Sequence, residues 1–261
     1  DVLALDKLRP MAGHREEPLL AFRHVESQNA SFQLPLKADF AETLSQINAK
    51  RRRKKFRTSE RRLEPLGGYR HITANDDASA QRLLGEFFRQ KSLRLSEQGL
   101  PDVFAEPGVH DVFARLASFS ANDGRPVLAL HSIEIEEDGV KTLLAVAGLT
   151  RKDAHITCQF GSVDDRTVPD ASAGELLFYL MIEQACADGA DCFDFGVGDQ
   201  RYKRSWCPVE TPHADVFLPL RGRGTLAAGV MAASVRAKRF VKTSPQARKF
   251  ADRIRALLNS K

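Results

Sequence analysis

Polar side chains alternate with apolar ones along the stretch 154–162, AHITCQFGS, where His155, Thr157 and Gln159 occupy every second position. Because alternate residues of a strand share a face, a strand here presents all three on one side. A polar row on a buried strand requires a cavity or hydrogen-bond partners. His155 is therefore a candidate general base, since imidazole titrates near neutral pH. The alternative is a histidine that is only hydrogen-bonded or faces an edge.

A carboxylate interrupts a second apolar stretch, 192–197, which reads CFDFGV with Asp194 at its centre. Burying a carboxylate is costly unless the charge is paired. Asp194 is therefore expected to orient His155 or an acceptor amine, or to form a structural ion pair with an arginine such as Arg201 or Arg204.

Small residues begin the helix expected at 173–188, where Ser172, Ala173 and Gly174 leave room for an anion. The free N–H groups and the dipole at a helix N-terminus favour a phosphate group there. The alternative needs no ligand, because Ser172 and Glu175 have the spacing S-x-x-E of a capping box.

The elements that must position these residues follow a readable order. Hydrophobic periodicity, turn residues and helix caps predict these elements: strands at 30–36, 69–73, 126–136, 140–150, 154–162, 192–197 and 211–218, and helices at 39–64, 77–98, 110–119, 173–188 and 199–207, with a helical region after Gly224 that Pro245 divides. The stretch before residue 30 is irregular. This order predicts an α/β fold with a mixed central sheet and helices on both faces.

Composition is that of a globular protein: 261 residues, of which 43% are hydrophobic and 28% charged. No apolar run is long enough to span a bilayer, and no signal peptide is visible. Four cysteines without C-x-x-C spacing predict free thiols in the cytoplasm, and the absence of clustered Cys and His predicts no metal site.

Basic residues are concentrated in two places, although the net charge is only +5. The run 50–57, KRRRKKFR, is interpreted first as a solvated helix face, second as a contact for CoA or nucleotide phosphates, and third as an RNA-binding patch. The stretch 226–240 combines an apolar face with basic residues. It is expected to pack against the sheet or a partner subunit, or else to lie on an anionic membrane.

The segment 193–206, FDFGVGDQRYKRSW, carries a resemblance to a known family. It resembles the fDfG.G...YK..W ending of the GNAT acetyltransferase superfamily, in the branch of CelD-like proteins linked to bacterial cellulose and exopolysaccharide synthesis. The basic region 49–63 and the element order over 69–218 are similar to the same branch. Members resemble two GNAT-like lobes, so the expected domains are a partial first lobe and linker helix (1–64), a GNAT-like domain (65–220) and a C-terminal helical extension (221–261). A start at Asp1 fits a fragment or a processed product.

The resemblance implies transfer of an acyl group from acetyl-CoA or another acyl-CoA to an amine or hydroxyl acceptor, such as a polysaccharide precursor. It implies a groove for the pantetheine arm where the strand at 154–162 parts from its neighbour, with a strand N–H polarising the thioester near Gln159. It implies that Tyr202 protonates the departing thiolate and that Lys203 faces the oxyanion or a phosphate. The alternatives are packing for Tyr202 and a solvated charge for Lys203.

Two other hypotheses remain open. The related FemABX transferases use aminoacyl-tRNA as the donor, and the basic run at 50–57 favours that donor here; otherwise no nucleic-acid partner is expected. The stretch 164–175, DDRTVPDASAGE, departs from the Q/R-x-x-G-x-G/A pattern usual at this turn in GNAT enzymes. That departure favours a non-catalytic, partner-binding lobe.

Overall fold

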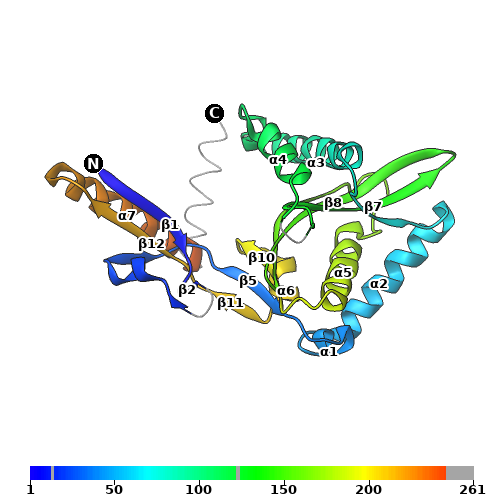
Figure 1. Ribbon diagram of the computed structural model, residues 1–261, viewed down its shortest axis with the longest axis horizontal. Helices are drawn as coiled ribbons and strands as arrows, with labels where there is room; N and C mark the ends of the chain where they lie inside the picture. Colours follow the sequence, from blue (N-terminus) through cyan, green and yellow to red (C-terminus); the bar gives the residue numbers. More distant parts are fainter. Residues whose placement is uncertain (13–14, 122–123, 245–261) are drawn as a thin grey trace. The chain divides into compact units, whose positions relative to one another are not determined.

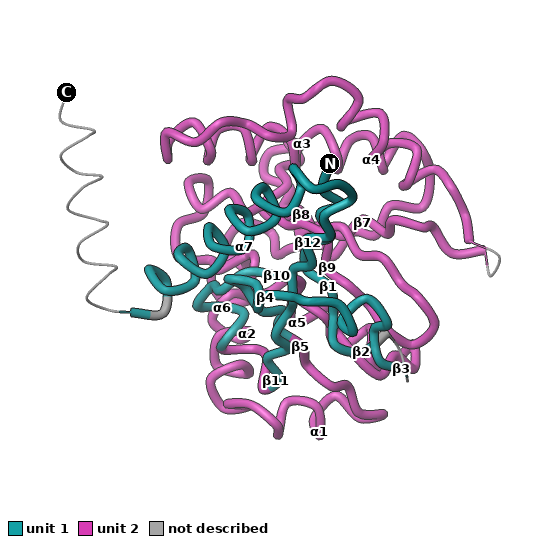
Figure 2. The backbone as a smooth tube through the Cα atoms, turned by 90° about the vertical axis from the view of Figure 1, so that its left-hand side faces the viewer, with its two compact units in different colours: residues 1–32, 197–204, 209–261 teal, residues 33–196, 205–208 magenta. Residues whose placement is uncertain are grey.

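A computed structural model describes residues 1–12, 15–121 and 124–244 of the chain (Figure 1). The chain forms two compact units, coloured separately in Figure 2. Unit 1 comprises residues 1–32, 197–204 and the chain from 209 onward, and unit 2 comprises residues 33–196 and 205–208. Each unit is described by itself below.

The centre of unit 2 is a sheet with the strand order β5-β10-β9-β8-β7-β6. The strands are β5 (Ser31–Pro35), β6 (Arg70–Thr73), β7 (Ala129–Glu137), β8 (Val140–Lys152), β9 (His155–Val163) and β10 (Cys192–Val197). Strands β6 to β9 pair antiparallel in succession, and β10 pairs parallel to β9. The expected mixed sheet is therefore confirmed.

Helices cover both faces of this sheet (Figure 1). The helices are α1 (Phe40–Ser45), α2 (Ala49–Leu63), α3 (Asp77–Glu97), α4 (Val109–Ser118) and α5 (Ala173–Ala187), with 3-10 turns at Glu64–Leu66 and Val103–Ala105. On one face α3 buries Leu83 and Phe87 against Leu130, Val146 and Phe160 of the strands, with α4 alongside. On the other face α5 packs on the sheet, with Phe178 4.8 Å from the Phe195 ring of β10. The α/β prediction with helices on both faces is confirmed.

The helix expected at 39–64 is two helices. Asp39 begins α1 as predicted, because its carboxylate accepts a hydrogen bond from the N–H of Ala41 at 2.8 Å. Asn48 then begins α2, because its side-chain oxygen accepts from the N–H of Arg51 at 3.0 Å. A second capping residue inside the basic region therefore restarts the helix in a new direction. The chain leaves α2 through a left-handed residue, Gly67 at φ 84°, and α2 ends at Leu63, next to the predicted end at residue 64.

Unit 1 has its own sheet, with the strand order β1-β12-β4 and all pairs antiparallel. Its elements are β1 (Val2–Leu8), β2 (Met11–Ala12), β3 (Arg15–Glu16), a 3-10 turn at Pro18–Ala21, β4 (His24–Glu26), β11 (Val209–Thr211), β12 (Ala214–Pro219) and α7 (Gly222–Thr243). The expectation of irregular structure before residue 30 is wrong, because β1 takes its partner from residues 214–219, far along the chain. The predicted division at Pro245 lies outside the described residues.

Helix α6 (Arg201–Trp206) follows β10, as the sequence predicted for 199–207. Within the described part of the chain, no helix has the length and apolar character needed to cross a membrane.

The substitution Gly148→Ala is expected to lower the free energy of unfolding by about 1–3 kcal/mol, the usual cost of overpacking a core. Gly148 of β8 lies opposite Phe160 of β9, and an added Cβ would lie 2.4 Å from Phe160 Cζ. The ring cannot easily move, because the rings of Phe87 and Phe113 contact it at centroid distances of 4.1 and 5.1 Å. Urea denaturation measures the loss. The control is Gly85→Ala in α3, where an added Cβ meets nothing within 4 Å. Equal stability of the two variants would contradict the packing argument.

Candidate active site

A histidine–carboxylate pair lies on neighbouring strands of unit 2. His155 Nε2 of β9 is 3.3 Å from Asp194 Oδ2 of β10. The parallel register places Thr157 opposite Asp194, so the three polar side chains share one face of the sheet. The adjacent residues of β10, Phe193 and Phe195, are buried on the α5 side. The polar row therefore lies on the face opposite α5.

Asp194 is fully buried, and its carboxylate is satisfied from three directions. Besides the His155 contact, Gln33 Nε2 of β5 donates to Oδ2 at 3.0 Å and the Gly196 N–H donates to Oδ1 at 2.7 Å. Of the two arginines considered as its ion-pair partner, Arg204 instead bonds Asp199 and Glu210. A buried carboxylate held this way fixes the orientation of the imidazole.

His155 is partly open to solvent, with 32% of its side chain exposed. When Nε2 carries the proton and donates it to Asp194, the lone pair of Nδ1 can accept a proton from another molecule. The arrangement therefore has the chemistry of a general base with an orienting carboxylate.

The ladder between β9 and β10 is short. It joins Cys192, Phe193 and Asp194 to His155, Ile156 and Thr157, although β9 continues to Val163 and β10 to Val197. Within the described ladders, the pairing of β9 with β8 also skips Gln159, because Cys158 pairs with Leu149 and Phe160 with Gly148. A bulge of this kind leaves the backbone of the extra residue outside the ladder.

The exposed side chain of Gln159 donates from Nε2 to Thr150 Oγ1 at 2.7 Å. The bulge at Gln159 lies two residues beyond the last β9–β10 pair, that of Thr157 with Asp194. Backbone and side-chain groups able to bind a ligand therefore follow directly on the polar row of β9.

The start of α5 does not have the capping box. Ser172 has left-handed backbone angles, φ 53° and ψ 41°, and its side chain makes no capping hydrogen bond. Glu175 instead pairs with two residues of α2, Arg52 at 2.5 Å and Lys55 at 3.2 Å. The S-x-x-E spacing was misleading, because Ser172 makes no capping hydrogen bond and Glu175 binds α2 instead.

The three residues proposed for anion binding at this helix start differ in exposure. Ser172 is exposed, Gly174 is half-buried and Ala173 is buried. An added Cβ on Gly174 would lie 2.7 Å from Val163 Cγ2, so glycine lets the helix approach the end of β9.

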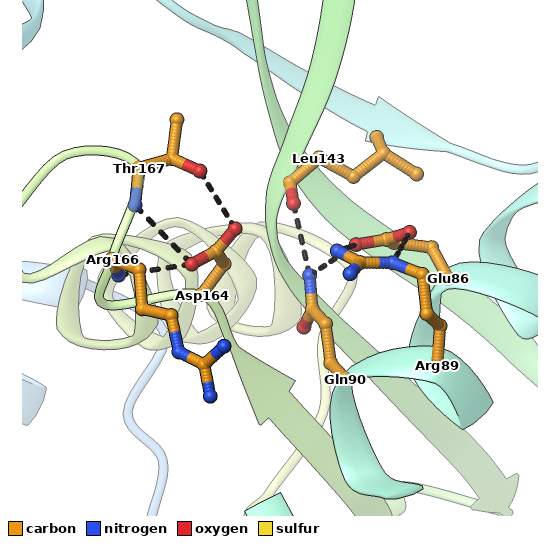
Figure 3. A network of polar contacts seen from close by, with 7 residues as sticks. All are labelled: Glu86, Arg89, Gln90, Leu143, Asp164, Arg166 and Thr167. Carbon is orange, nitrogen blue, oxygen red and sulfur yellow. Dashed lines mark hydrogen bonds and ion pairs between the residues drawn. The ribbon is translucent and has the colours of Figure 1, made fainter. Parts of the chain in front are cut away.

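The loop after β9 holds its own carboxylate (Figure 3). Asp164 accepts hydrogen bonds from the Arg166 N–H at 2.9 Å, the Thr167 N–H at 3.3 Å and the Thr167 hydroxyl at 2.8 Å. Partial burial opposes the charge, yet the hydrogen bonds, led by that from the Arg166 N–H, lower the pKa of Asp164. The two loop amides are thus occupied, and a phosphate here would need side-chain donors.

Side-chain donors are present around the same loop. A cavity of about 330 Å³ is lined by arginines and carboxylates of α3 and of the loop, among them Arg89, Arg94, Arg166, Glu97 and Asp165. Gln90, which also lines the cavity, joins α3 to β8: its Nε2 donates to the Leu143 carbonyl at 2.9 Å and to Glu86 Oε1 at 2.8 Å (Figure 3). The sequence analysis did not identify these arginines, because the hydrophobic periodicity of α3 indicated only that the helix packs on the core.

Tyr202 and Lys203 belong to unit 1 and are described apart from the His155 pair. Lys203 is only 5% exposed, and its Nζ donates to the Val197 carbonyl at 3.0 Å. The alternative of a solvated charge for Lys203 is therefore wrong. Tyr202 is 37% exposed.

The basic run is not a uniformly solvated helix face. Arg51 and Arg53 are exposed, but Arg52 is only 1% exposed. Its guanidinium donates to Glu175 and, at 2.6 Å, to Ser205, and it stacks 4.0 Å over the ring of the fully buried Trp206. Burial lowers the pKa of Arg52, against the pull of Glu175. One arginine of the run is thus part of the core of unit 2, where it packs on the buried Trp206.

Metal chemistry has no support among the residues that the structure describes. None of them form a group of three or more His, Cys, Asp or Glu side chains placed to hold an ion.

Comparison with known proteins identifies a matching family and similar solved structures. The family model described as an acetyltransferase (GNAT) domain matches residues 50–204. Among solved structures, FemX aligns with a TM-score of 0.56 and 13% identity over 80% of this chain. The alignment takes in 65% of FemX, which is less than two thirds of that chain.

A second solved structure is the C-terminal domain of a putative lysylphosphatidylglycerol synthetase from Agrobacterium fabrum. It aligns with a TM-score of 0.52 and 13% identity over 89% of this chain and 71% of its own. No curated protein matches the chain in sequence. At such low identity these structures support the fold alone.

The family match covers more than half of the chain, and it takes in β9, β10, the loop after β9 and the His155–Asp194 pair. It sets aside the alternative of a non-catalytic lobe. The chain belongs to the GNAT acetyltransferase domain family and is an acyltransferase.

Proposed function

We propose that this acyltransferase uses an acyl-CoA thioester as its donor and His155 as the general base that activates an amine or hydroxyl acceptor. The observation that carries the proposal is the contact of His155 with the buried, fully hydrogen-bonded Asp194 on the open polar face of β9. A base that is both partly exposed and oriented by a buried anion is suited to proton abstraction.

In the proposed step, the acceptor N–H or O–H gives its proton to His155 Nδ1. The acceptor atom then bonds to the thioester carbonyl carbon, and the negative charge on the oxygen is stabilised by an N–H of the β9 bulge near Gln159. Collapse of this intermediate breaks the carbon–sulfur bond. The thiolate leaves and takes a proton from the imidazolium of His155.

The phosphates of the donor are assigned to the loop after β9 and to the start of α5 at Ser172 and Gly174. Support comes from the arginines that line the adjoining cavity, since guanidinium groups bind phosphate in a bidentate manner. We place the reaction in the cytoplasm, which fits four free cysteines. The resemblance to CelD-like proteins favours a polysaccharide precursor as the acceptor.

Acetyl-CoA is expected to raise the melting temperature of the full chain. A ligand that binds only the folded state stabilises it by about 2.7 kcal/mol at a hundred times its Kd. Differential scanning fluorimetry with acetyl-CoA, CoA and longer acyl-CoAs measures the shift. The variant Arg94→Gln, which changes the cavity wall, should reduce the shift, whereas Arg115→Gln, an exposed arginine of α4, should not.

If no CoA compound raises the melting temperature, acyl-CoA is rejected as the donor. A shift with aminoacyl-tRNA instead would favour the second candidate, transfer from aminoacyl-tRNA. That candidate is supported by the exposed basic side chains of α2 and by the structural likeness to FemX. The affinity for aminoacyl-tRNA should fall in the double variant Arg51→Gln, Arg53→Gln. Arg52 must be kept, because it is part of the core.

A further inference from the structure

Helix α7 of unit 1 carries an apolar stripe that faces solvent. Leu226, Val230, Ala233, Ala237 and Phe240 follow each other at alternating steps of four and three residues, and all are exposed. Such spacing keeps side chains on one face of a helix. The exposed fractions are 78% for Leu226, 63% for Val230 and 65% for Phe240, so this face covers no core.

The packed face of α7 is a different one. Gly224 and Ala228 are buried, and Ala232 and Val235 are half-buried, where the helix lies on β12 and β4. These positions follow the same helical spacing about half a turn away from the stripe. The fold therefore uses one apolar face of α7 and leaves a second one, about 21 Å long at 1.5 Å per residue, without a function in packing.

The charged residues of α7 indicate which kind of surface could cover the apolar stripe. The sequence of α7, Gly222–Thr243, contains no acidic residue. Exposed bases lie at both ends of the stripe, Arg223 in the first turn and Arg236 and Lys238 toward the end. Two such helices would repel each other, which argues against a second copy of this chain.

An anionic lipid surface can both cover the apolar stripe and attract the basic side chains beside it. Apolar side chains of an interfacial helix enter the acyl region while Lys and Arg side chains reach the headgroups. We propose that unit 1 holds this acyltransferase on an anionic membrane through the Leu226–Phe240 stripe of α7 and its flanking bases. The inference does not depend on the acyl donor.

The test is co-sedimentation of the full chain with vesicles. Vesicles of phosphatidylcholine alone are compared with vesicles in which a third of the lipid is phosphatidylglycerol. Binding is expected only to the anionic vesicles and is expected to weaken as salt rises. The variant Val230→Glu should lower the vesicle partition coefficient about tenfold. The variant Lys238→Gln should lower it about fivefold, which corresponds to about 1 kcal/mol per base near the surface.

Unit 2 supplies matched controls. Val140 is 65% exposed, close to the 63% of Val230, and Lys141 beside it is exposed. Neither residue lies in the proposed active site. The variants Val140→Glu and Lys141→Gln should bind vesicles as the unchanged chain does.

Three outcomes would overturn the proposal. One is equal binding to both kinds of vesicle, or to neither. Another is an equal loss of binding in Val140→Glu and Val230→Glu. The third is a dimer, seen by light scattering without lipid, that Val230→Glu dissociates, because the stripe would then be covered by a second copy.

Discussion

Replacing His155 with glutamine is expected to lower kcat by about 10²–10⁴-fold, the usual contribution of a positioned general base. Glutamine fills similar space and can still donate to Asp194 Oδ2, which His155 Nε2 contacts at 3.3 Å, but it cannot take a proton. The KM for the acyl donor should change little, since the base acts on the acceptor. Steady-state kinetics measures kcat and KM in both enzymes.

Asp194 acts through His155 and is a positioning residue. The variant Asp194→Asn should lower kcat, because the imidazole loses the carboxylate that orients it. Asn at this buried position can disturb the fold, so Gln33→Leu serves as a milder variant, because it removes the Gln33 hydrogen bond to Oδ2 and keeps the His155 contact. The control is His110→Gln on α4, where the histidine is exposed and stacks on Phe88. Unchanged kcat in His155→Gln would remove the base assignment.

Replacing Arg52 with alanine is expected to lower the free energy of unfolding by about 3 kcal/mol, at the lower end of the cost of breaking a buried pair. The change leaves Glu175 without its closest cation, removes the Ser205 hydrogen bond and uncovers the Trp206 ring. Lys55 remains 3.2 Å from Glu175 and limits the loss. Chemical denaturation measures the change in unit 2.

The neighbouring Arg51→Ala is the matched control for this prediction. Arg51 lies in the same helix but is exposed, so its loss should change stability by less than about 0.5 kcal/mol. The variant Arg52→Lys should recover only part of the stability, because an ammonium cannot bridge Glu175 and Ser205 as a planar guanidinium does. If Arg51→Ala and Arg52→Ala lose similar amounts of unfolding free energy, the charge of the run contributes to stability and the burial of Arg52 does not.

Much of unit 2 could be predicted because its patterns are local. Alternation identified β9 and its polar row, the predicted helix end at residue 64 lies next to the end of α2 at Leu63, and the order of elements predicted the mixed sheet. The same patterns suggested that Asp194 could orient His155. That contact forms because adjacent parallel strands bring residues 155 and 194 to one face.

The features that were missed depend on partners far away in sequence. The burial of Arg52 follows from Glu175, Ser205 and Trp206, and no pattern within 50–57 marks one arginine as different. Ser172 and Glu175 have the spacing of a cap, but Glu175 is drawn to α2 instead. The arginines of α3 became candidates only when the fold placed them beside the loop after β9.

The pairing of β1 with β12 has a consequence for synthesis on the ribosome. Val2 pairs with Pro219 and Leu8 with Ala214, so β1 must wait for its partner until residue 219 has been made and has emerged. At about 5–20 residues per second this delay is on the order of 10–40 s. Throughout that time β1 carries unpaired backbone groups that can join another nascent chain. Chaperones that shield exposed strands are therefore expected to matter most for residues 2–8, long after translation has passed them.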